Sequence, residues 1–142
     1  MIDLGGGAPR RVTDDAEGVG WPVWSPDGTR LAVEVMRGGD THVGWLPVDG
    51  GPVRAVVTAP GQSWPQSFSP DGRRIAYAGQ RRGVWNVYSV ALEGGDERPL
   101  TAYSTPAGYV RYPFWSPRGG RVLYEYAESV STVWTTRLPP AP

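Results

Sequence analysis

The chain has 142 residues, 39% of them hydrophobic and 11% aromatic, a composition typical of one folded domain rather than a disordered segment. Its 14 basic and 14 acidic side chains cancel, so we expect no nucleic-acid partner and no attraction to an anionic membrane. Cysteine is absent, which excludes disulfides, thiolate metal sites and cysteine nucleophiles.

No targeting or membrane-spanning segment is indicated by the sequence. Residues 1–5 have neither the basic region nor the apolar core of a signal peptide, and no apolar run reaches the length of about 18 residues that a membrane helix needs. We therefore expect a soluble chain without a membrane span. The composition leaves its compartment open.

Three near-copies of one pentapeptide divide the sequence. They occupy residues 24–28, 68–72 and 115–119 and have the sequences Trp-Ser-Pro-Asp-Gly, Phe-Ser-Pro-Asp-Gly and Trp-Ser-Pro-Arg-Gly. The serines of successive copies are 44 and 47 residues apart. Self-similarity at this period is typical of a repeat architecture built from four-stranded blades.

The segment before the first pentapeptide is predicted to supply opening strands over residues 1–13. Residues 2–4 resemble the end of a strand, the glycines at 5–7 a turn, and residues 10–13 the strand that follows. On this interpretation the chain opens in the middle of a blade.

Residues 21–58 are predicted to form the first complete blade. The Ser-Pro-Asp-Gly run places Pro, Asp and Gly where a type I turn favours them, and Asp27 is expected to cap that turn through local hydrogen bonds. The next strand alternates, with Leu31, Val33 and Val35 on one face. A third strand, a Gly-Gly turn and a short fourth strand complete the blade.

Residues 64–101 repeat this pattern and are predicted to form a second blade. Residues 112–138 begin a third, in which Arg118 replaces the turn aspartate and no Gly-Gly-Leu-Thr follows Leu138. We therefore predict an incomplete third blade and a Pro-rich tail over residues 139–142.

Several positions that recur in register resemble the TolB-type β-propeller repeat, a WD40-like repeat also called PD40. They are the Pro-x-Trp-Ser-Pro-Asp-Gly run that starts at Pro22, the strand Ile75-Ala76-Tyr77, the turn Gly94-Gly95 and the ending Leu100-Thr101. The resemblance implies an all-β fold, a propeller segment of about three four-stranded blades. It also implies a non-catalytic scaffold that binds a protein or peptide, in the periplasm or cell envelope if upstream sequence is missing.

Three blades are too few to close a propeller, which needs four to eight. Two solutions stay open. Two copies could form a six-bladed ring as a homodimer, with residues 10–13 of one copy completing the unfinished blade of the other. Alternatively, the chain is part of a longer propeller whose other blades precede Met1.

Aromatic residues at the starts of the blades are the candidate binding site. Trp21, Trp64 and Tyr112 each stand directly before the Pro of an innermost strand, and with Gln62 and Arg111 we expect them to ring one mouth of the channel. Exposed Trp, Tyr and Arg dominate binding hot spots. The alternative is that these aromatics pack against the neighbouring blade.

The other aromatic positions are assigned to the framework. Trp24, Phe68 and Trp115 are expected between blades, because residues two apart on a strand share a face. The third-strand tryptophans, Trp45, Trp85 and Trp134, are expected in the blade core.

No catalytic constellation is found in the sequence. The single histidine, His42, is expected in a loop, and no Gly-x-Ser-x-Gly motif is present, so we expect no catalytic residues and no cofactor. Asp14, Asp15 and Glu17 could supply oxygen ligands to Ca²⁺, but they do not match an EF-hand and are equally explained as a solvated acidic loop. No metal site is assigned.

Two further functions stay open beside the binding scaffold. The chain could be the propeller portion of a prolyl-oligopeptidase-like peptidase or other hydrolase whose catalytic domain lies elsewhere. It could also bind a small molecule or a sugar at the aromatic mouth.

Overall fold

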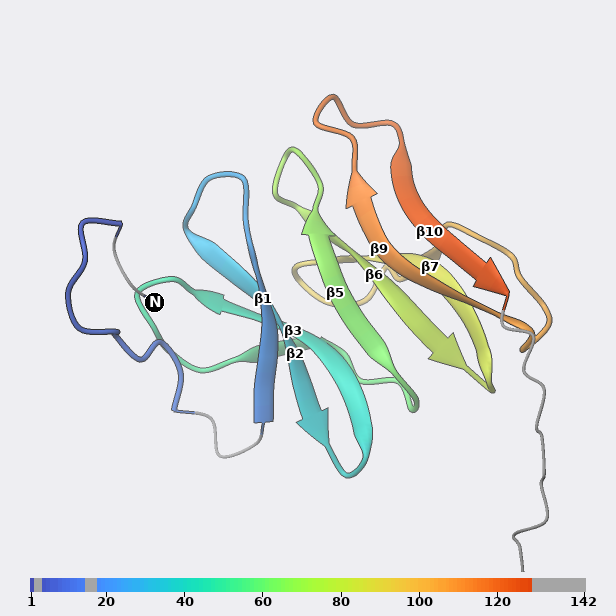
Figure 1. The fold of residues 1–142 in the computed structure, drawn as a ribbon, viewed down its shortest axis with the longest axis horizontal. Coiled ribbons are helices and arrows are strands. Elements are labelled where there is room, and N and C mark those ends of the chain that lie inside the picture. The colour runs from blue at the N-terminus through green and yellow to red at the C-terminus, as the bar shows by residue number, and fades with distance from the viewer. Residues whose placement is uncertain (2–3, 15–17, 129–142) are drawn as a thin grey trace, which may run out of the picture.

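The computed structural model describes residues 1, 4–14 and 18–128. Over these residues the chain forms ten strands and no helix. The strands make two four-stranded sheets and one two-stranded sheet, and within each sheet consecutive strands pair antiparallel. The three sheets lie next to one another in chain order, with the face of each sheet directed toward the next (Figure 1). The predicted propeller segment of antiparallel blades is thus confirmed.

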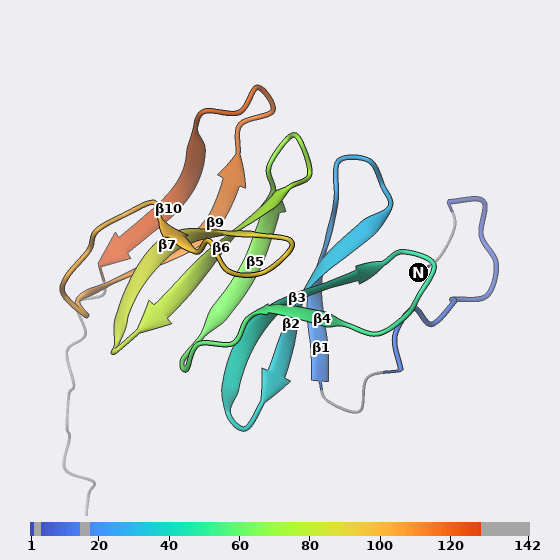
Figure 2. The ribbon, with the colours of Figure 1, turned by 180° about the vertical axis from the view of Figure 1, so that it is seen from behind.

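Blade 1 is the sheet of residues 18–57, formed by four strands in chain order. They are β1 (Gly18–Trp24), β2 (Arg30–Arg37), β3 (Asp40–Pro47) and β4 (Arg54–Val57). The central pair β2–β3 is continuous from Arg30 opposite Pro47 to Arg37 opposite Asp40. β1 faces the viewer in Figure 1 and β4 faces the viewer in Figure 2.

Blade 2 is the sheet of residues 63–99 and has the same order. Its strands are β5 (Ser63–Phe68), β6 (Arg74–Arg81), β7 (Val84–Ala91) and the two-residue β8 (Arg98–Pro99). Blade 3 consists of β9 (Gly108–Trp115) and β10 (Val122–Glu128), so it begins before the expected residue 112. The third strand expected around residues 132–136 and the tail at 139–142 lie outside the described residues.

The pentapeptide forms the turn between the first and second strands, as the sequence predicts. In blade 1 the Gly28 N–H donates to the Ser25 carbonyl at 3.0 Å, and Asp27 Oδ1 accepts from the Thr29 N–H at 3.0 Å. Asp71 accepts from the Arg73 N–H at 3.1 Å in blade 2. These aspartates therefore cap their turns, and hydrogen bonds from Ser25 and Thr29 lower the pKa of Asp27 to about 2.

Residues 4–14 do not form the expected opening strand. The Arg10 guanidinium instead donates to the carbonyls of Val48 and Asp49 at 3.1 Å each, in the turn after β3. Val12 packs against the outer face of blade 1. Within this chain, Arg10 and Val12 thus attach the opening segment to blade 1.

Two hydrophobic clusters lie between blades, and a third lies on the outer face of blade 1. Blade 1 and blade 2 share a cluster that includes Val43, Phe68 and Tyr77, and the Trp45 indole N–H donates across it to the Leu92 carbonyl at 2.9 Å. Blade 2 and blade 3 share a smaller cluster of Ala78, Val87 and Val110. Each blade is therefore stabilised by its neighbours, as burial of apolar faces requires.

The expected position of one aromatic residue between blades needs correction. Phe68 is buried between blades 1 and 2, but its equivalent Trp24 is 53% exposed. Trp24 lies on the face of blade 1 that no other described blade covers. Trp45 and Trp85 pack against the clusters between blades, whereas Trp134 lies outside the described residues.

No helix among the described residues has the length and apolar character to cross a membrane.

Candidate binding cleft on the first strands

The first strands of the three blades lie side by side, and each contains a β-bulge. In β1 the bulge lies between Gly20 and Val23, and in β5 it lies between Pro65 and Ser67. In β9 it lies between Arg111 and Phe114. Bulges re-aim side chains and are common next to binding sites. The aligned bulges therefore place a row of irregular positions along one side of the molecule (Figure 1).

Two bulge residues adopt a backbone conformation that side chains rarely tolerate. Trp21 has φ of 49° and Tyr112 has φ of 53°. A left-handed conformation costs a non-glycine residue about 1–2 kcal/mol. Strain of this kind persists where the surrounding structure imposes it, and it is common at functional sites.

A cleft of about 410 Å³ opens at these bulges. Its walls come from all three blades, and all five residues expected at the mouth line it. The lining residues are Trp21, Glu34, Gln62, Trp64, Gln66, Arg111 and Tyr112. The sequence prediction missed Glu34 and Gln66.

The register corrects the equivalence of the three aromatics. Trp64 pairs with Ala78, at the place where Gly20 pairs with Glu34 and Arg111 with Glu125. Trp64 is therefore equivalent to Gly20 and Arg111, not to Trp21 and Tyr112. The proline that follows Trp64 stands one residue further from the turn than the prolines of the other two blades.

Exposure separates the aromatics in the same way. Trp21 is 59% exposed and Tyr112 is 41% exposed, so both present their rings to solvent at the cleft. Trp64 is half-buried, lies 4.4 Å from the Trp85 ring between centroids, and packs against the cluster between blades 2 and 3. Trp64 thus lines the cleft and also packs against the neighbouring blade.

Gln62 connects blades 1 and 2 beside the cleft. Its side-chain oxygen accepts from the Thr41 hydroxyl at 3.2 Å, and its side-chain nitrogen donates to the Gly39 carbonyl at 3.4 Å. Its own carbonyl accepts from the Gln80 N–H at 2.8 Å. These bonds fix the wall of the cleft, so Gln62 is largely engaged by the protein itself.

Arg111 occupies the blade 3 side of the cleft. One terminal nitrogen donates to Glu125 Oε1 at 2.9 Å and to the Tyr109 hydroxyl at 3.1 Å, while the guanidinium carbon lies 5.6 Å from the Tyr112 ring centroid. The bond to Glu125 raises the pKa of Arg111. Its Nε is buried and has no hydrogen-bond partner among the described residues.

Glu34 brings a buried carboxyl group to the blade 1 side. It is only 6% exposed, and burial raises its pKa although a hydrogen bond from Thr41 acts in the opposite direction. The sequence carried a signal for it, because Glu34 interrupts the otherwise apolar run from Leu31 to Val35. A lone carboxylate in such a run has to face either a partner or a cavity.

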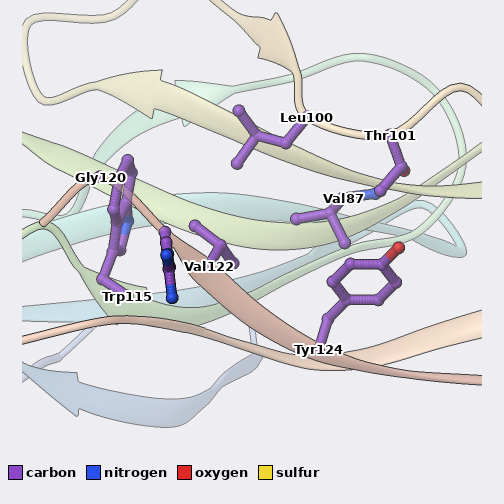
Figure 3. Close-up of a pocket in the computed structure, with 8 residues that line it drawn as sticks. Val87, Leu100, Thr101, Trp115, Gly120, Val122 and Tyr124 are labelled. Carbon is purple, nitrogen blue, oxygen red and sulfur yellow. The ribbon is translucent and has the colours of Figure 1, made fainter.

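A second hollow, of about 200 Å³, lies between blades 2 and 3 and is shown in Figure 3. Val87, Val122 and the ring of Tyr124 border it, with Leu100 on another side. The Thr101 hydroxyl beside it donates to Asn86 at 2.8 Å and accepts from the Val87 N–H at 2.9 Å. Its apolar walls and engaged hydroxyl assign this hollow to packing between the blades.

Other candidates from the sequence do not join the cleft. His42 is buried within β3 rather than in a loop, opposite Val35. Asp14 forms an exposed ion pair with Arg11 at 3.1 Å, and Asp15 and Glu17 lie outside the described residues. Over residues 1, 4–14 and 18–128, no group of three acidic or histidine side chains is placed to hold a metal ion.

The bladed sheets and the cleft on their first strands define the class of protein as a β-propeller segment. The chain belongs to the family of the TolB beta propeller domain, called PD40, whose model matches residues 1–136. No curated protein matches the chain in the sequence comparison.

Two solved structures are similar to this chain. A putative TolB from Agrobacterium tumefaciens has 25% identity and a TM-score of 0.71, over 88% of this chain and 48% of the other. TolB from Acinetobacter baumannii has 19% identity and a TM-score of 0.64, over 78% of this chain and 27% of the other, which shows a shared fold. The chain therefore spans about half the length of the first of these structures.

Proposed function

We propose that this propeller segment is a non-catalytic scaffold that binds a protein or peptide in the cleft on its first strands. One observation carries the proposal: Trp21 and Tyr112, on different blades, are both exposed and held in strained conformations at the same cleft. Rigidly held aromatic side chains bind at low cost in conformational entropy.

The polar groups around these rings suit a peptide. Gln66 carries an amide that can both donate and accept, and the Arg111 guanidinium lies beside Tyr112 at the same cleft. Backbone carbonyls and amides of an extended peptide are matched by such groups. Because three blades contribute walls, the cleft also depends on the packing between blades.

Peptide selection tests this proposal. Random peptides displayed on phage are selected on the wild-type chain and then measured on the double variant Trp21→Ser, Tyr112→Ser. We expect the selected peptides to lose at least about tenfold in affinity, since hot-spot residues contribute 2 kcal/mol or more. Trp24→Ser is the matched control, because Trp24 is exposed but outside the cleft.

Selected peptides that bind the double variant as well as the wild type would contradict the proposal. Binding of oligosaccharides but not of peptides, with loss in the same double variant, would favour the sugar-site alternative instead.

We further propose that the uncovered face of blade 3 is closed by blade 1 of a second copy. Leu123 is 76% exposed on that face, whereas its equivalents Ala32 and Ala76 are buried against the following blade. The chain covers 48% of the similar structure from A. tumefaciens, so two copies supply about its whole length. Each interface would bury the same pair of faces that already meet inside the chain, and Val12 would have to leave the face of blade 1 that it packs against.

Light scattering on the purified chain tests this closure. We expect a particle of twice the 15.4 kDa chain mass, and dissociation in the variant Leu123→Arg, because an unpaired charge would be buried in the interface. Glu93→Arg, at an exposed turn residue away from this face, is the control. A monomeric wild type would contradict the dimer and favour further blades as the partner.

A further inference from the structure

Glu34 is a buried group in the cleft that the aromatic binding proposal does not use. It lies on β2 of blade 1, is 6% exposed and lines the cleft. Buried carboxylates are expected to be paired with a cation or fully hydrogen-bonded. The contacts around Glu34 can be compared directly with those of Glu125, its equivalent on blade 3.

The two glutamates differ in their partners. Glu125 pairs across the strands with Arg111 and accepts its hydrogen bond at 2.9 Å. Glu34 pairs across the strands with Gly20, which has no side chain. Over residues 18–128, no arginine forms an ion pair with Glu34. The cation that balances the carboxylate in blade 3 therefore has no counterpart in blade 1.

The available hydrogen bonds do not replace that cation. Among the described residues the Thr41 hydroxyl is the side-chain group that reaches Glu34, and the same hydroxyl donates to Gln62 Oε1 at 3.2 Å. A hydroxyl has a single proton, so it cannot serve both acceptors at once. A carboxylate has about four acceptor positions, which leaves most of the capacity of Glu34 unused.

The residues that line the cleft can stabilise a positively charged group next to Glu34. Trp21, Trp64 and Tyr112 line the same space, and the faces of aromatic rings attract ammonium and guanidinium groups. Arg111 lies on the blade 3 side, where its charge is balanced by Glu125. A positively charged group can therefore approach Glu34 without facing an unbalanced arginine.

We infer that the blade 1 side of the cleft is a subsite for a basic side chain, arginine or lysine, of the peptide partner, with Glu34 as its counter-ion and the aromatic rings as its walls. This inference rests on the proposed function, since it assigns the charge of the ligand at the same cleft. The ammonium or guanidinium group takes the place that Gly20 leaves empty, as Arg111 does for Glu125.

NMR titration of the full chain with two amino acids that are capped at both ends, so that their termini carry no charge, tests the subsite. Acetyl-arginine amide carries the cation, and acetyl-citrulline amide has the same shape without the charge. We expect arginine to bind at least about tenfold more tightly than citrulline, because a charged partner strengthens the hydrogen bonds to a carboxylate. Amide signals of Glu34, Trp21 and Trp64 should shift with the arginine probe.

Two variants assign the effect to Glu34. Glu34→Gln should reduce arginine binding to the level of citrulline and leave citrulline unchanged. Gly20→Arg should block the arginine probe by supplying the missing cation from the chain itself, and a Cβ at position 20 meets Glu34 Oε2 at an ordinary 3.5 Å. Glu93→Gln removes an exposed charge outside the cleft and should change neither probe.

The outcomes separate this inference from the proposed function. Equal binding of the two probes, or arginine binding that survives Glu34→Gln, overturns the subsite even where peptides bind through Trp21 and Tyr112. Arginine binding that depends on Glu34 supports the subsite even where the peptide selection fails. If neither probe binds, the subsite is overturned.

Discussion

Blade 2 and blade 3 are built from the same repeat, yet their second strands have very different surroundings. In β6 five consecutive residues are buried, whereas in β10 the described residues are half-buried or exposed. Equivalent positions differ most clearly at Ala76, which is fully buried, and Leu123, which is largely exposed. Blades 1 and 3 pack on the two faces of β6, whereas no described blade covers the outer face of β10, so the burial of each repeat depends on what packs against it.

The largest effect that tests this comparison is expected at Phe68. Phe68→Ala should destabilise the chain by about 3–5 kcal/mol, because a buried aromatic side chain leaves a cavity between blades 1 and 2. The equivalent change Trp24→Ala should cost less than about 1 kcal/mol on the uncovered face. Urea unfolding followed by circular dichroism measures both, and similar losses would show that Trp24 is also covered.

Enlarging a buried alanine should have the next largest effect. Ala76→Leu should cost about 1–3 kcal/mol, since the added atoms have no space between blades 2 and 3. Leu123→Ala makes the opposite change at the equivalent exposed position and should stay within about 0.5 kcal/mol in a monomer. Thermal unfolding of the two variants at several chain concentrations checks this, and a costly Leu123→Ala would indicate that the face is buried in an assembly.

A serine between the first strands of blades 2 and 3 gives a third test. The Ser67 hydroxyl donates to the Pro113 carbonyl at 2.7 Å and accepts from the Trp115 N–H at 3.0 Å. Ser67→Ala should cost about 1–3 kcal/mol, because it leaves two buried backbone groups without partners. Ser104→Ala, at an exposed serine, is the control. An effect no larger than the control would mean that water replaces both bonds.

The smallest effect is expected at the turn of blade 3. Arg118→Asp restores the aspartate that accepts hydrogen bonds in the other two turns, and should raise Tm by a few degrees at most. Hydrogen bonds hold the pKa of Asp27 at about 2, below its usual value of 3.8. A group with a lowered pKa stabilises the fold above that usual value, and the contribution is lost as pH falls from about 4 to 2.

The gain from Arg118→Asp should therefore disappear over the same pH interval. Differential scanning calorimetry of the variant and the wild type at pH 7 and at pH 2.5 measures the difference in Tm at each pH. A gain that persists at the lower pH would mean that removal of the arginine, not the new acceptor, is responsible.

Much of the fold could be predicted because its signals are local. The Ser-Pro-Asp-Gly turn, the alternation of Leu31, Val33 and Val35, and the Gly-Gly turns each depend on a few adjacent residues. The first two blades accordingly lie within a few residues of the predicted limits. Residues 4–14 form no strand within this chain although their glycine turn resembles the others, because Arg10 and Val12 contact blade 1 through residues far away in the sequence.

The candidate site could be predicted in part. All five expected residues line the cleft, since aromatics beside the first-strand prolines share one end of the repeat. The sequence carried a signal for their different roles that the prediction missed: Trp64 stands four residues before Phe68, whereas Trp21 and Tyr112 stand three residues before Trp24 and Trp115. An offset of one residue changes which face of a strand a side chain takes. Glu34 was missed because its importance depends on an absent side chain at Gly20, which only the register brings opposite.

The sequence by itself determined that this chain is a β-propeller segment, because turn chemistry and strand periodicity repeat along it and each depends on neighbouring residues. Only the tertiary structure decided which repeated positions are buried, which are strained and which share a cleft. Burial and cavity lining depend on contacts between blades, and residues distant in the sequence meet there without any local signal of their meeting.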